Sequence, residues 1–408
     1  MTACKKRGTG MRKLAMAVLV ILAVALISGA QTGKQVIQAG PKLNYPFSPA
    51  IKAGNLIYAS GMLATDAAGK IVPGDVKAQT RRVVENLGEI LKAGGSSLQN
   101  VVATNVYLKN VADFPAMNEA YKDFWPKDPP VRTTVGANLV MPEALVEISA
   151  VAVPNGGERR VVLPSGWLKP ASPYSYGIMS GDTLFLAGLV SRNGKDNTIV
   201  EGDMATQTRT VMDNAGEILK AAGMTHENVV SSRVFISDGA YFGDMNAAYR
   251  IYFPKNPPAR ATVRCPLVDA KYLVEITMLA VKGPREAITA PNADGTPGQP
   301  STILSSAIKA GNRLYLSGSL GSTSANKGDI KGQTRETLIR IERTLKAAGF
   351  GWENVTDGIV YITDVKNFAG MNEAYREIFT KDFPARATVE TGLVVQDGLV
   401  EIMFTAVK

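Results

Sequence analysis

The sequence predicts an α+β protein made of three tandem copies of one β-β-α-β-α-β-β domain. Two observations carry this prediction. Several strings recur three times at fixed offsets, and each copy alternates strand and helix patterns. The copies are expected to span residues 35–154, 159–283 and 287–408, with a Pro- and Gly-rich linker before the last.

The recurring strings keep one spacing throughout the chain. The string Gln79-Thr80-Arg81 recurs as Gln207-Thr208-Arg209 and as Gln333-Thr334-Arg335. MNEAY, MNAAY and MNEAY follow at the same two offsets, as do PVRTTV, PARATV and PARATV. In each copy, the same interval separates the Arg of the last string from the Glu of an LVEI string. Duplication of a domain preserves such offsets, whereas chance does not.

Within the first copy, a local sequence pattern predicts each strand and each helix. Gly54-Asn55 marks a turn between two short strands. An apolar stripe of helical period ends at Gly94-Gly95, and Pro126 stops a second helix. The expected elements are strands at Ile51 and Leu56 to Ser60, a helix from Asp75 to Lys92, a strand from Val101 to Leu108, a helix from Asp113 to Phe124, and strands from Arg132 to Ala137 and Leu145 to Val153.

The last strand carries apolar residues on both faces, from Leu145 to Val153. A strand buried on both sides implies that the sheets of different copies pack against each other. Three copies with the same uncovered face close naturally around one axis. We therefore predict an intrachain pseudo-trimer whose sheets meet in the middle.

The segment before the first copy, residues 1–30, predicts a secretory signal peptide. Basic residues precede the apolar run from Leu14 to Ile27, and Ser28-Gly29-Ala30 offers small residues for cleavage after Ala30. An uncleaved N-terminal membrane anchor is the alternative, but the run is shorter than the ~20 residues of a usual span. We expect a secreted or periplasmic protein with no membrane span after cleavage.

The charge balance gives little reason to expect nucleic acid as a partner. The formal net charge is +9, but five of these charges lie in the leader, which leaves +4 for the rest of the chain. Cys265 is the only cysteine beyond the leader, so no intramolecular disulfide is expected. We predict that it is buried, with pairing between chains as the alternative.

Four kinds of polar or small residue recur in all copies where packing does not explain them. The arginine suits a carboxylate or phosphate clamp, and equally a structural salt bridge. The glutamate could orient or deprotonate a water, or satisfy buried donors. The asparagine suits a backbone cap, and the glycine a close approach of backbones or a ligand. These residues are Arg132, Arg260 and Arg386; Glu147, Glu275 and Glu401; Asn118, Asn246 and Asn372; and Gly61, Gly188 and Gly318.

Several chemistries are excluded by what the sequence lacks. His226 is the only histidine, so the copies cannot each hold a Ser-His-Asp triad or a histidine metal site. Neither a Walker loop nor a Rossmann fingerprint is found. No cofactor or metal is therefore expected. The tyrosines of the MNxAY strings, Tyr121, Tyr249 and Tyr375, are interpreted as core residues.

The strings FPARATV…GLVEIMFTAVK and PPARATV…YLVEITMLAVK, each preceded by MNxAY, resemble the RidA/YjgF reactive-intermediate deaminases, also called L-PSP endoribonucleases. The resemblance covers residues 40–408 three times. It implies a chorismate-mutase-like fold that forms trimers with a ligand cleft at each subunit interface. One chain would supply all three subunits here and would be a monomer.

The resemblance also assigns roles to the recurring residues. The arginines would bind the substrate carboxylate, the glutamates would position the catalytic water, and the asparagines and glycines would line the cleft. The sequence departs from the family pattern at two positions. The usual cysteine is replaced by Thr134, Thr262 and Thr388, and the cleft tyrosine near the domain start matches only Tyr174, with Phe47 and Leu304 in the other copies. We expect three unequal clefts, with the Tyr174 cleft the best candidate for activity.

Three functions follow, in order of preference. The first is hydrolytic deamination of small 2-imino or 2-enamino acids to 2-keto acids and ammonia, so the expected partner is a small carboxylate. The second is a non-catalytic carboxylate-binding or chaperone-like protein of the cell envelope. The third is an endoribonuclease, which is disfavoured because two copies lack a histidine and the chain lacks a basic patch.

Overall fold

The computed structural model describes residues 1–2, 33–39 and 44–408, and the contacts below all lie within residues 32–408. The expected signal peptide and its cleavage site fall largely on residues 3–32, outside the described residues. No helix in the described ranges combines the length and apolar character that a membrane crossing needs.

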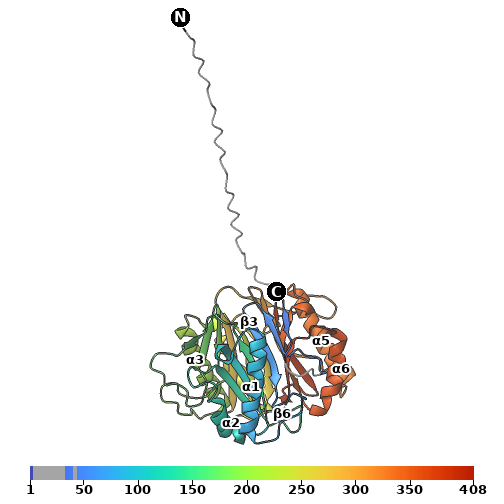
Figure 1. Cartoon of the computed structure of the whole chain (residues 1–408). Helices are drawn as coiled ribbons and strands as arrows, with labels where there is room; N and C mark the ends of the chain where they lie inside the picture. Colours follow the sequence, from blue (N-terminus) through green and yellow to red (C-terminus); the bar gives the residue numbers. More distant parts are fainter. Residues whose placement is uncertain (3–32, 40–43) are drawn as a thin grey trace. The chain divides into compact units, whose positions relative to one another are not determined.

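Each repeat folds into one mixed sheet with two helices (Figure 1). The first repeat contains β1 (Gln35–Ile37), β2 (Ala50–Ala53), β3 (Leu56–Met62), α1 (Val76–Ala93), β4 (Val101–Leu108), α2 (Phe114–Tyr121), β5 (Val131–Gly136), β6 (Asn138–Leu139) and β7 (Val146–Ala152).

The second and third repeats follow the same order of helices and main strands, with differences only in the short strands. The second contains β8 (Arg160–Val162), β9 (Gly177–Ser180), β10 (Thr183–Leu186), β11 (Leu189–Val190), α3 (Met204–Ala221), β12 (Val229–Ile236), α4 (Phe242–Tyr249), β13 (Ala259–Arg264) and β14 (Val274–Val281). The third contains β15 (Glu286–Ile288), β16 (Ala307–Ala310), β17 (Arg313–Leu316), β18 (Ser319–Leu320), α5 (Ile330–Ala347), β19 (Val355–Ile362), α6 (Phe368–Ile378), β20 (Ala385–Glu390), β21 (Gly392–Leu393) and β22 (Val400–Val407).

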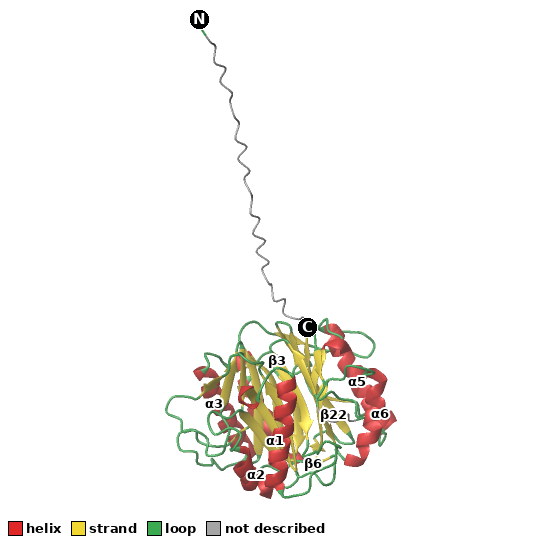
Figure 2. Cartoon of the chain, in the orientation of Figure 1, coloured by secondary structure: helices red, strands yellow, loops and turns green. Residues whose placement is uncertain are grey.

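The long helix of the first repeat shows why these residues form these elements. The side chain of Asp75 caps the first turn of α1 by accepting from the amide of Ala78. Gly95, with φ of +77°, allows the chain to leave the helix. Between these ends, α1 buries one apolar face against its own sheet, including Val83 and Leu87. Figure 2 shows α1 and α5 each lying against strands.

The differences from the sequence prediction include an extra strand in each repeat and a shorter second helix in the first. Each repeat begins with an additional short edge strand, β1, β8 or β15, too short for a periodic pattern to reveal. The helix α2 ends at Tyr121 rather than at Phe124. Trp125 leaves the helical path because its ring is buried against Tyr121 and its indole N–H donates to the carbonyl of Leu98 at 2.7 Å.

The three sheets are joined by short strands that cross from one repeat to another. β6 of the first repeat pairs with β20 of the third, and β21 of the third pairs with β13 of the second. A single bridge between Val135 and Leu267 joins the first and second repeats. Every repeat therefore contacts both others, although the sheets do not close into one. This is the expected intrachain pseudo-trimer.

One buried cluster contains side chains from all three repeats. Tyr107, Phe235 and Tyr361 occupy equivalent positions in β4, β12 and β19 and lie together in this cluster. The sheets thus meet in the middle, which confirms the expectation drawn from the doubly apolar last strands. The helices cover the other face of each sheet, as the separate clusters under α1 and α5 show.

Candidate active site

Each repeat buries one arginine at the second position of a strand: Arg132 in β5, Arg260 in β13 and Arg386 in β20. The next repeat holds the backbone of each arginine. The amide of Gly188 donates to the carbonyl of Arg132 at 3.0 Å, and that of Gly318 to the carbonyl of Arg260 at 3.1 Å. The amide of Arg386 donates to the hydroxyl of Ser60 at 2.8 Å. The arginines therefore lie at the three contacts between repeats.

Each guanidinium group lies over the ring of a tyrosine from the second helix of its own repeat. The distance from Cζ to the ring centroid is 4.9 Å for Tyr121, 4.9 Å for Tyr249 and 4.7 Å for Tyr375. Such stacking is favourable because the ring face is electron-rich. The tyrosines are fully buried, as the sequence predicts, but they also support the cation at each interface.

Several of the buried guanidinium N–H groups have no acceptor among the residues that the structure describes. They are Nη1 of Arg132, Nε and Nη1 of Arg260, and Nε of Arg386. Burial lowers the pKa of Arg386 to about 10, so the group is still charged at neutral pH. A buried cation with unused donors is stabilised by an anion with two acceptor oxygens, such as a carboxylate.

The asparagines of the second helices differ in whether they hydrogen-bond to the arginine of their own repeat. The side-chain oxygen of Asn246 accepts from Nη2 of Arg260 at 2.6 Å, and that of Asn372 accepts from Nη2 of Arg386 at 2.7 Å. In the first repeat, the side-chain oxygen of Asn118 is buried without a partner. The first arginine is therefore the least restrained by its own repeat.

The recurring glutamates face these arginines from the neighbouring repeat and are buried to at most 3% exposure: Glu147 in β7, Glu275 in β14 and Glu401 in β22. The amide of Thr134 donates to Oε1 of Glu275 at 3.2 Å across the interface. Backbone amides of Thr388 and Thr262 bond Glu147 and Glu401 in the same way. The backbone just after each arginine thus holds the carboxyl group of the next repeat.

Burial dominates the protonation of the three glutamates. It raises the pKa of each carboxyl to about 8, against the lowering effects of the threonine amide and the nearby arginine. At pH 7 each carboxyl is therefore neutral and carries a proton. A protonated acid that can lose its proton near neutrality is suited to general acid–base catalysis.

The arginine and glutamate at one interface belong to different repeats. We call the pair Arg132 and Glu275 the first cleft, Arg260 and Glu401 the second cleft, and Arg386 and Glu147 the third cleft. Among the residues that the structure describes, no ion pair within 4.0 Å joins the two members of any cleft. The simple structural salt bridge considered from sequence is thus not formed.

The glycine that ends the second strand leaves room for the carboxyl group. A Cβ atom added at Gly61, Gly188 or Gly318 would lie 1.9 Å from Oε1 of Glu147, Glu275 or Glu401 respectively. The recurrence of glycine at this position follows from that contact, because no larger residue fits without moving the carboxyl group.

Substituting Gly188→Ala is expected to lower the free energy of unfolding by about 1–3 kcal/mol, because the new methyl group must displace Glu275. Chemical unfolding of the purified chain measures the effect. Gly243→Ala in α4 is the matched control, since nothing lies within 4 Å of its added Cβ. A Gly188→Ala chain as stable as the control would show that the carboxyl group is not confined as described.

The three repeats each match a known protein family. The family model described as Endoribonuclease L-PSP matches residues 37–154, 166–282 and 297–408. The chain belongs to the endoribonuclease L-PSP family. The resemblance drawn from the sequence strings is thereby confirmed.

Relatives of this L-PSP family chain have about the length of one repeat. A RutC family protein of Pyrococcus abyssi is 42% identical over 122 residues, which cover 29% of this chain and 96% of the relative. The 3-aminoacrylate deaminase RutC of Acinetobacter baylyi is 43% identical over 108 residues, which cover 26% of this chain and 86% of that enzyme.

One solved structure resembles a larger part of the chain. The crystal structure of a chorismatase matches 76% of this chain and 93% of its own, with a TM-score of 0.51 and 16% sequence identity. At this identity the likeness concerns the fold alone.

The clefts of this L-PSP family chain differ in the residue that the neighbouring repeat places over the arginine. Tyr174 lies 5.9 Å from Cζ of Arg132, and Phe47 lies 5.6 Å from Cζ of Arg386. Leu304 replaces the aromatic residue in the second cleft, and Arg260 stacks only on Tyr249 among the described aromatic rings. The first and third clefts therefore have an aromatic wall, of tyrosine and phenylalanine respectively, and the sequence has leucine at the equivalent position of the second.

The threonines that replace the family cysteine contribute to the clefts through backbone and side chain. Their amides bond the glutamates, as described above. Their hydroxyls are all buried without a partner; they belong to Thr134, Thr262 and Thr388. In each cleft, the threonine whose amide bonds the glutamate thus has a buried hydroxyl without a partner among the described residues.

Two kinds of cleft residue were not predicted from the sequence. The stacking tyrosines follow the cleft asparagines at the i, i+3 spacing in MNxAY, and this spacing places both on one helix face. That spacing could have suggested a shared role. Ser60 and Ser317 accept the backbone amides of Arg386 and Arg260, while the first cleft has Ala187 at this position. Nothing in the local pattern distinguishes these serines from ordinary strand residues.

Two further reactive side chains, those of His226 and Cys265, have structural roles. His226 packs against Tyr252 and Phe253, and burial lowers its pKa. Cys265 is a buried free thiol, as predicted, and burial raises its pKa. Within residues 33–39 and 44–408, no group of histidine, cysteine and carboxylate side chains could hold a metal ion.

Proposed function

We propose that the chain hydrolyses small 2-imino and 2-enamino acids to 2-keto acids and ammonia at its three clefts. The observation that carries this proposal is the pairing, at each contact between repeats, of a buried arginine with unused donors and a buried glutamate whose pKa is raised to about 8. The similarity of part of the chain to RutC proteins, one of them named a 3-aminoacrylate deaminase, supports the same class of substrate.

The arginine would bind the carboxylate of the substrate. Its free N–H groups form a planar fork that matches two carboxylate oxygens. The tyrosine ring beneath the guanidinium group fixes its plane, and the aromatic wall from the next repeat limits the space above it. The C=N carbon next to the carboxylate would then lie between the arginine and the glutamate.

The glutamate would act first as an acid and then as a base. Its carboxyl group donates a proton to the imine nitrogen, and the resulting carboxylate takes a proton from the water that attacks the imine carbon. The C–O bond forms as the C=N π bond becomes a nitrogen lone pair. The glutamate then protonates the amino group of this carbinolamine and accepts the hydroxyl proton as the C–N bond breaks. Ammonia and a 2-keto acid leave, and the glutamate is protonated again.

The first cleft is proposed to be the most active. It combines Tyr174 with an arginine that no side-chain oxygen holds, because Asn118 leaves its own oxygen unpaired. In the other two clefts, an asparagine already uses one donor of the arginine. A substrate carboxylate therefore competes with fewer protein contacts in the first cleft.

Ammonia release from 2-iminopropionate generated in situ tests the proposal. We expect the wild-type chain to release ammonia faster than the Arg132→Ala/Arg260→Ala/Arg386→Ala variant, by about 10²–10⁴-fold. Circular dichroism must show that the variant is folded. Equal rates for the two chains would refute the proposal. In that case, a ligand-induced rise in melting temperature without turnover would favour the carboxylate-binding alternative.

The predicted signal peptide supports placing this reaction outside the cytoplasm. Mass spectrometry of the chain purified from its source tests this placement. A mature N-terminus at Gln31 is expected, and a chain that retains Met1 in the cytoplasmic fraction would contradict it.

A further inference from the structure

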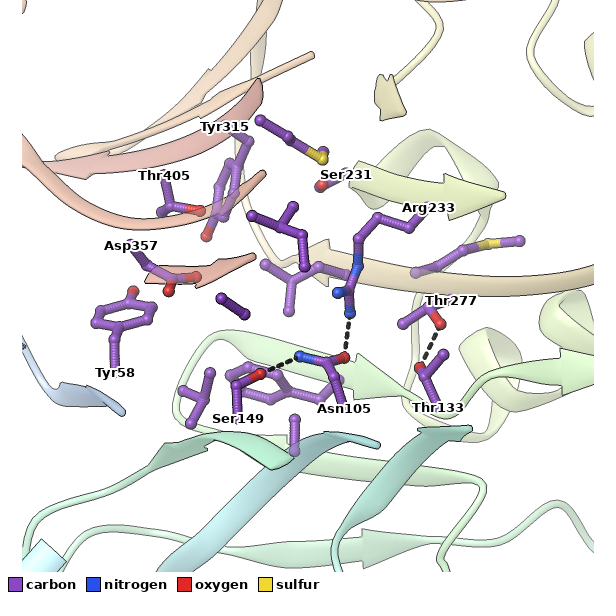
Figure 3. A pocket seen from close by; sticks show the side chains of 18 of the residues that line it. Tyr58, Asn105, Thr133, Ser149, Ser231, Arg233, Thr277, Tyr315, Asp357 and Thr405 are labelled. Atoms are coloured by element: carbon purple, nitrogen blue, oxygen red, sulfur yellow. Dashed lines mark hydrogen bonds between the residues drawn. The ribbon is translucent and has the colours of Figure 1, made fainter. Parts of the chain in front are cut away.

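A separate cavity of about 140 Å³ lies where the three sheets meet. Its wall includes residues of β4, β12 and β19, one strand from each repeat (Figure 3). None of the arginines or glutamates of the three clefts lines it. The cavity is therefore distinct from the sites proposed for deamination.

The repeats contribute different side chains to equivalent positions of this cavity. Asn105, Arg233 and Ile359 occupy one equivalent position. On the same face of the strand, the third repeat places Asp357 where the other repeats have small residues. A trimer of identical chains would surround such a cavity with three identical sets, whereas this single chain supplies one cation and one anion.

The positive side of the cavity is built as a fixed network. Nη2 of Arg233 donates to the side-chain oxygen of Asn105, and the amide nitrogen of Asn105 donates to the hydroxyl of Ser149 at 3.0 Å. Thr133 and Thr277 lie beside this network, hydrogen-bonded to each other. Figure 3 shows Arg233 and Asn105 directed toward each other on one side of the hollow.

The negative side of the cavity is Asp357, next to Tyr58 in Figure 3. Burial raises the pKa of this carboxyl to about 6, so it is ionised at pH 7.5. Among the described residues, no ion pair joins Asp357 to Arg233 or to any other cation. Arg233 lowers the pKa of Asp357 through space, but the two opposite charges line one cavity without forming a contact ion pair among the described residues.

Arg233 and Asp357 are half-buried between the sheets, where a charge is less well solvated than in water and gains from a partner of opposite sign. A ligand that carries both an anionic and a cationic group would provide both partners at once. The volume also limits the ligand, because a cavity of this size holds about six non-hydrogen atoms. Glycine and alanine, with five and six such atoms, match this limit in size and in charge.

We propose that the central cavity binds one small zwitterionic amino acid, with its carboxylate on Arg233 and its ammonium group on Asp357. Thr133, Thr277 and Tyr58 also line the cavity and add hydroxyl groups to its wall. This site shares no catalytic residue with the clefts, although Arg233 lies close enough to Glu275 to lower the pKa of that carboxyl.

Isothermal titration at pH 7.5 with glycine, acetate and methylammonium tests the proposal. Glycine is expected to bind with one site per chain and more tightly than either single-charge probe. Arg233→Met should weaken glycine binding by about 10- to 100-fold, as expected for loss of a charged hydrogen bond. Asp357→Asn should remove the advantage of glycine over acetate, because it removes only the partner of the ammonium group.

Several outcomes would overturn the proposal. If glycine does not bind, the cavity holds only water. If three glycine molecules bind per chain, or if neither substitution changes glycine binding, the ligand binds in the clefts instead. Asp357→Asn keeps the shape of the side chain, so it decides the question if Arg233→Met fails to fold. Glu158→Gln, on an exposed residue, is the matched control for the carboxylate-to-amide change.

Discussion

Replacing Glu147, Glu275 and Glu401 together by glutamine is expected to slow hydrolysis of 2-iminopropionate by about 10²–10⁴-fold. The three carboxyls are neutral at pH 7 because burial raises the pKa of each to about 8. Glutamine has the same shape and charge as a protonated glutamate, and its oxygen can accept the same threonine amide. The fold should therefore persist, while the proton that the reaction needs is lost.

The rate of ammonia release at saturating substrate measures this loss. A chain with Glu158, Glu217 and Glu286 changed to glutamine is the matched control, because all three of these residues are exposed. If the buried triple variant retains the wild-type rate and fold, the glutamates are structural and the proposed acid–base role is wrong.

The same carboxyls are expected to make the folded chain less stable as the pH rises from about 5 to 9. Each has a pKa of about 8 when folded against an ordinary value of 4.5, so the folded chain keeps protons that the unfolded chain has lost. The stability that these protons contribute is present in full below pH 4.5. It is lost as the pH rises through about 8.

Thermal unfolding at a series of pH values tests this dependence. The window from pH 7 to 9 isolates the glutamates, since the pKa of Asp357, about 6, lies below it. We expect the melting temperature of the wild-type chain to fall across this window and that of the Glu147→Gln/Glu275→Gln/Glu401→Gln chain to fall less. Parallel curves for the two chains would mean that the glutamates titrate normally.

Much of the fold could be predicted because the local signals agree with one another. The strand from Val101 to Leu108 has the bounds that its apolar pattern suggested, and Asp75 and Gly94-Gly95 end α1 where capping preferences place them. The repeat itself added information, because a polar residue that recurs at the same position in all three copies is a stronger sign of a shared role than a polar residue that occurs once. It selected Arg132, Glu147, Asn118 and their equivalents.

The sequence could not reveal which repeats share a cleft. Arg132 and Glu147 lie close in sequence within one repeat, yet Arg132 lies with Glu275 because the first and second repeats dock against each other. The protonation of the glutamates was also hidden, since it depends on burial by two repeats at once. The central cavity was missed for the same reason, because Arg233 and Asp357 approach it from different sheets.

Each proposed site combines an arginine of one repeat with a glutamate of the next. Two double variants, each compared with Arg132→Ala alone, test this pairing by their rates of ammonia release. We expect Arg132→Ala/Glu275→Gln to be as active as Arg132→Ala, because both changes fall in the first cleft. We expect Arg132→Ala/Glu147→Gln to be less active, because it damages two clefts. The reverse result, with the Glu147 double variant equal to the single variant and the Glu275 double variant less active, would place the sites within repeats and rule out the pairing between repeats.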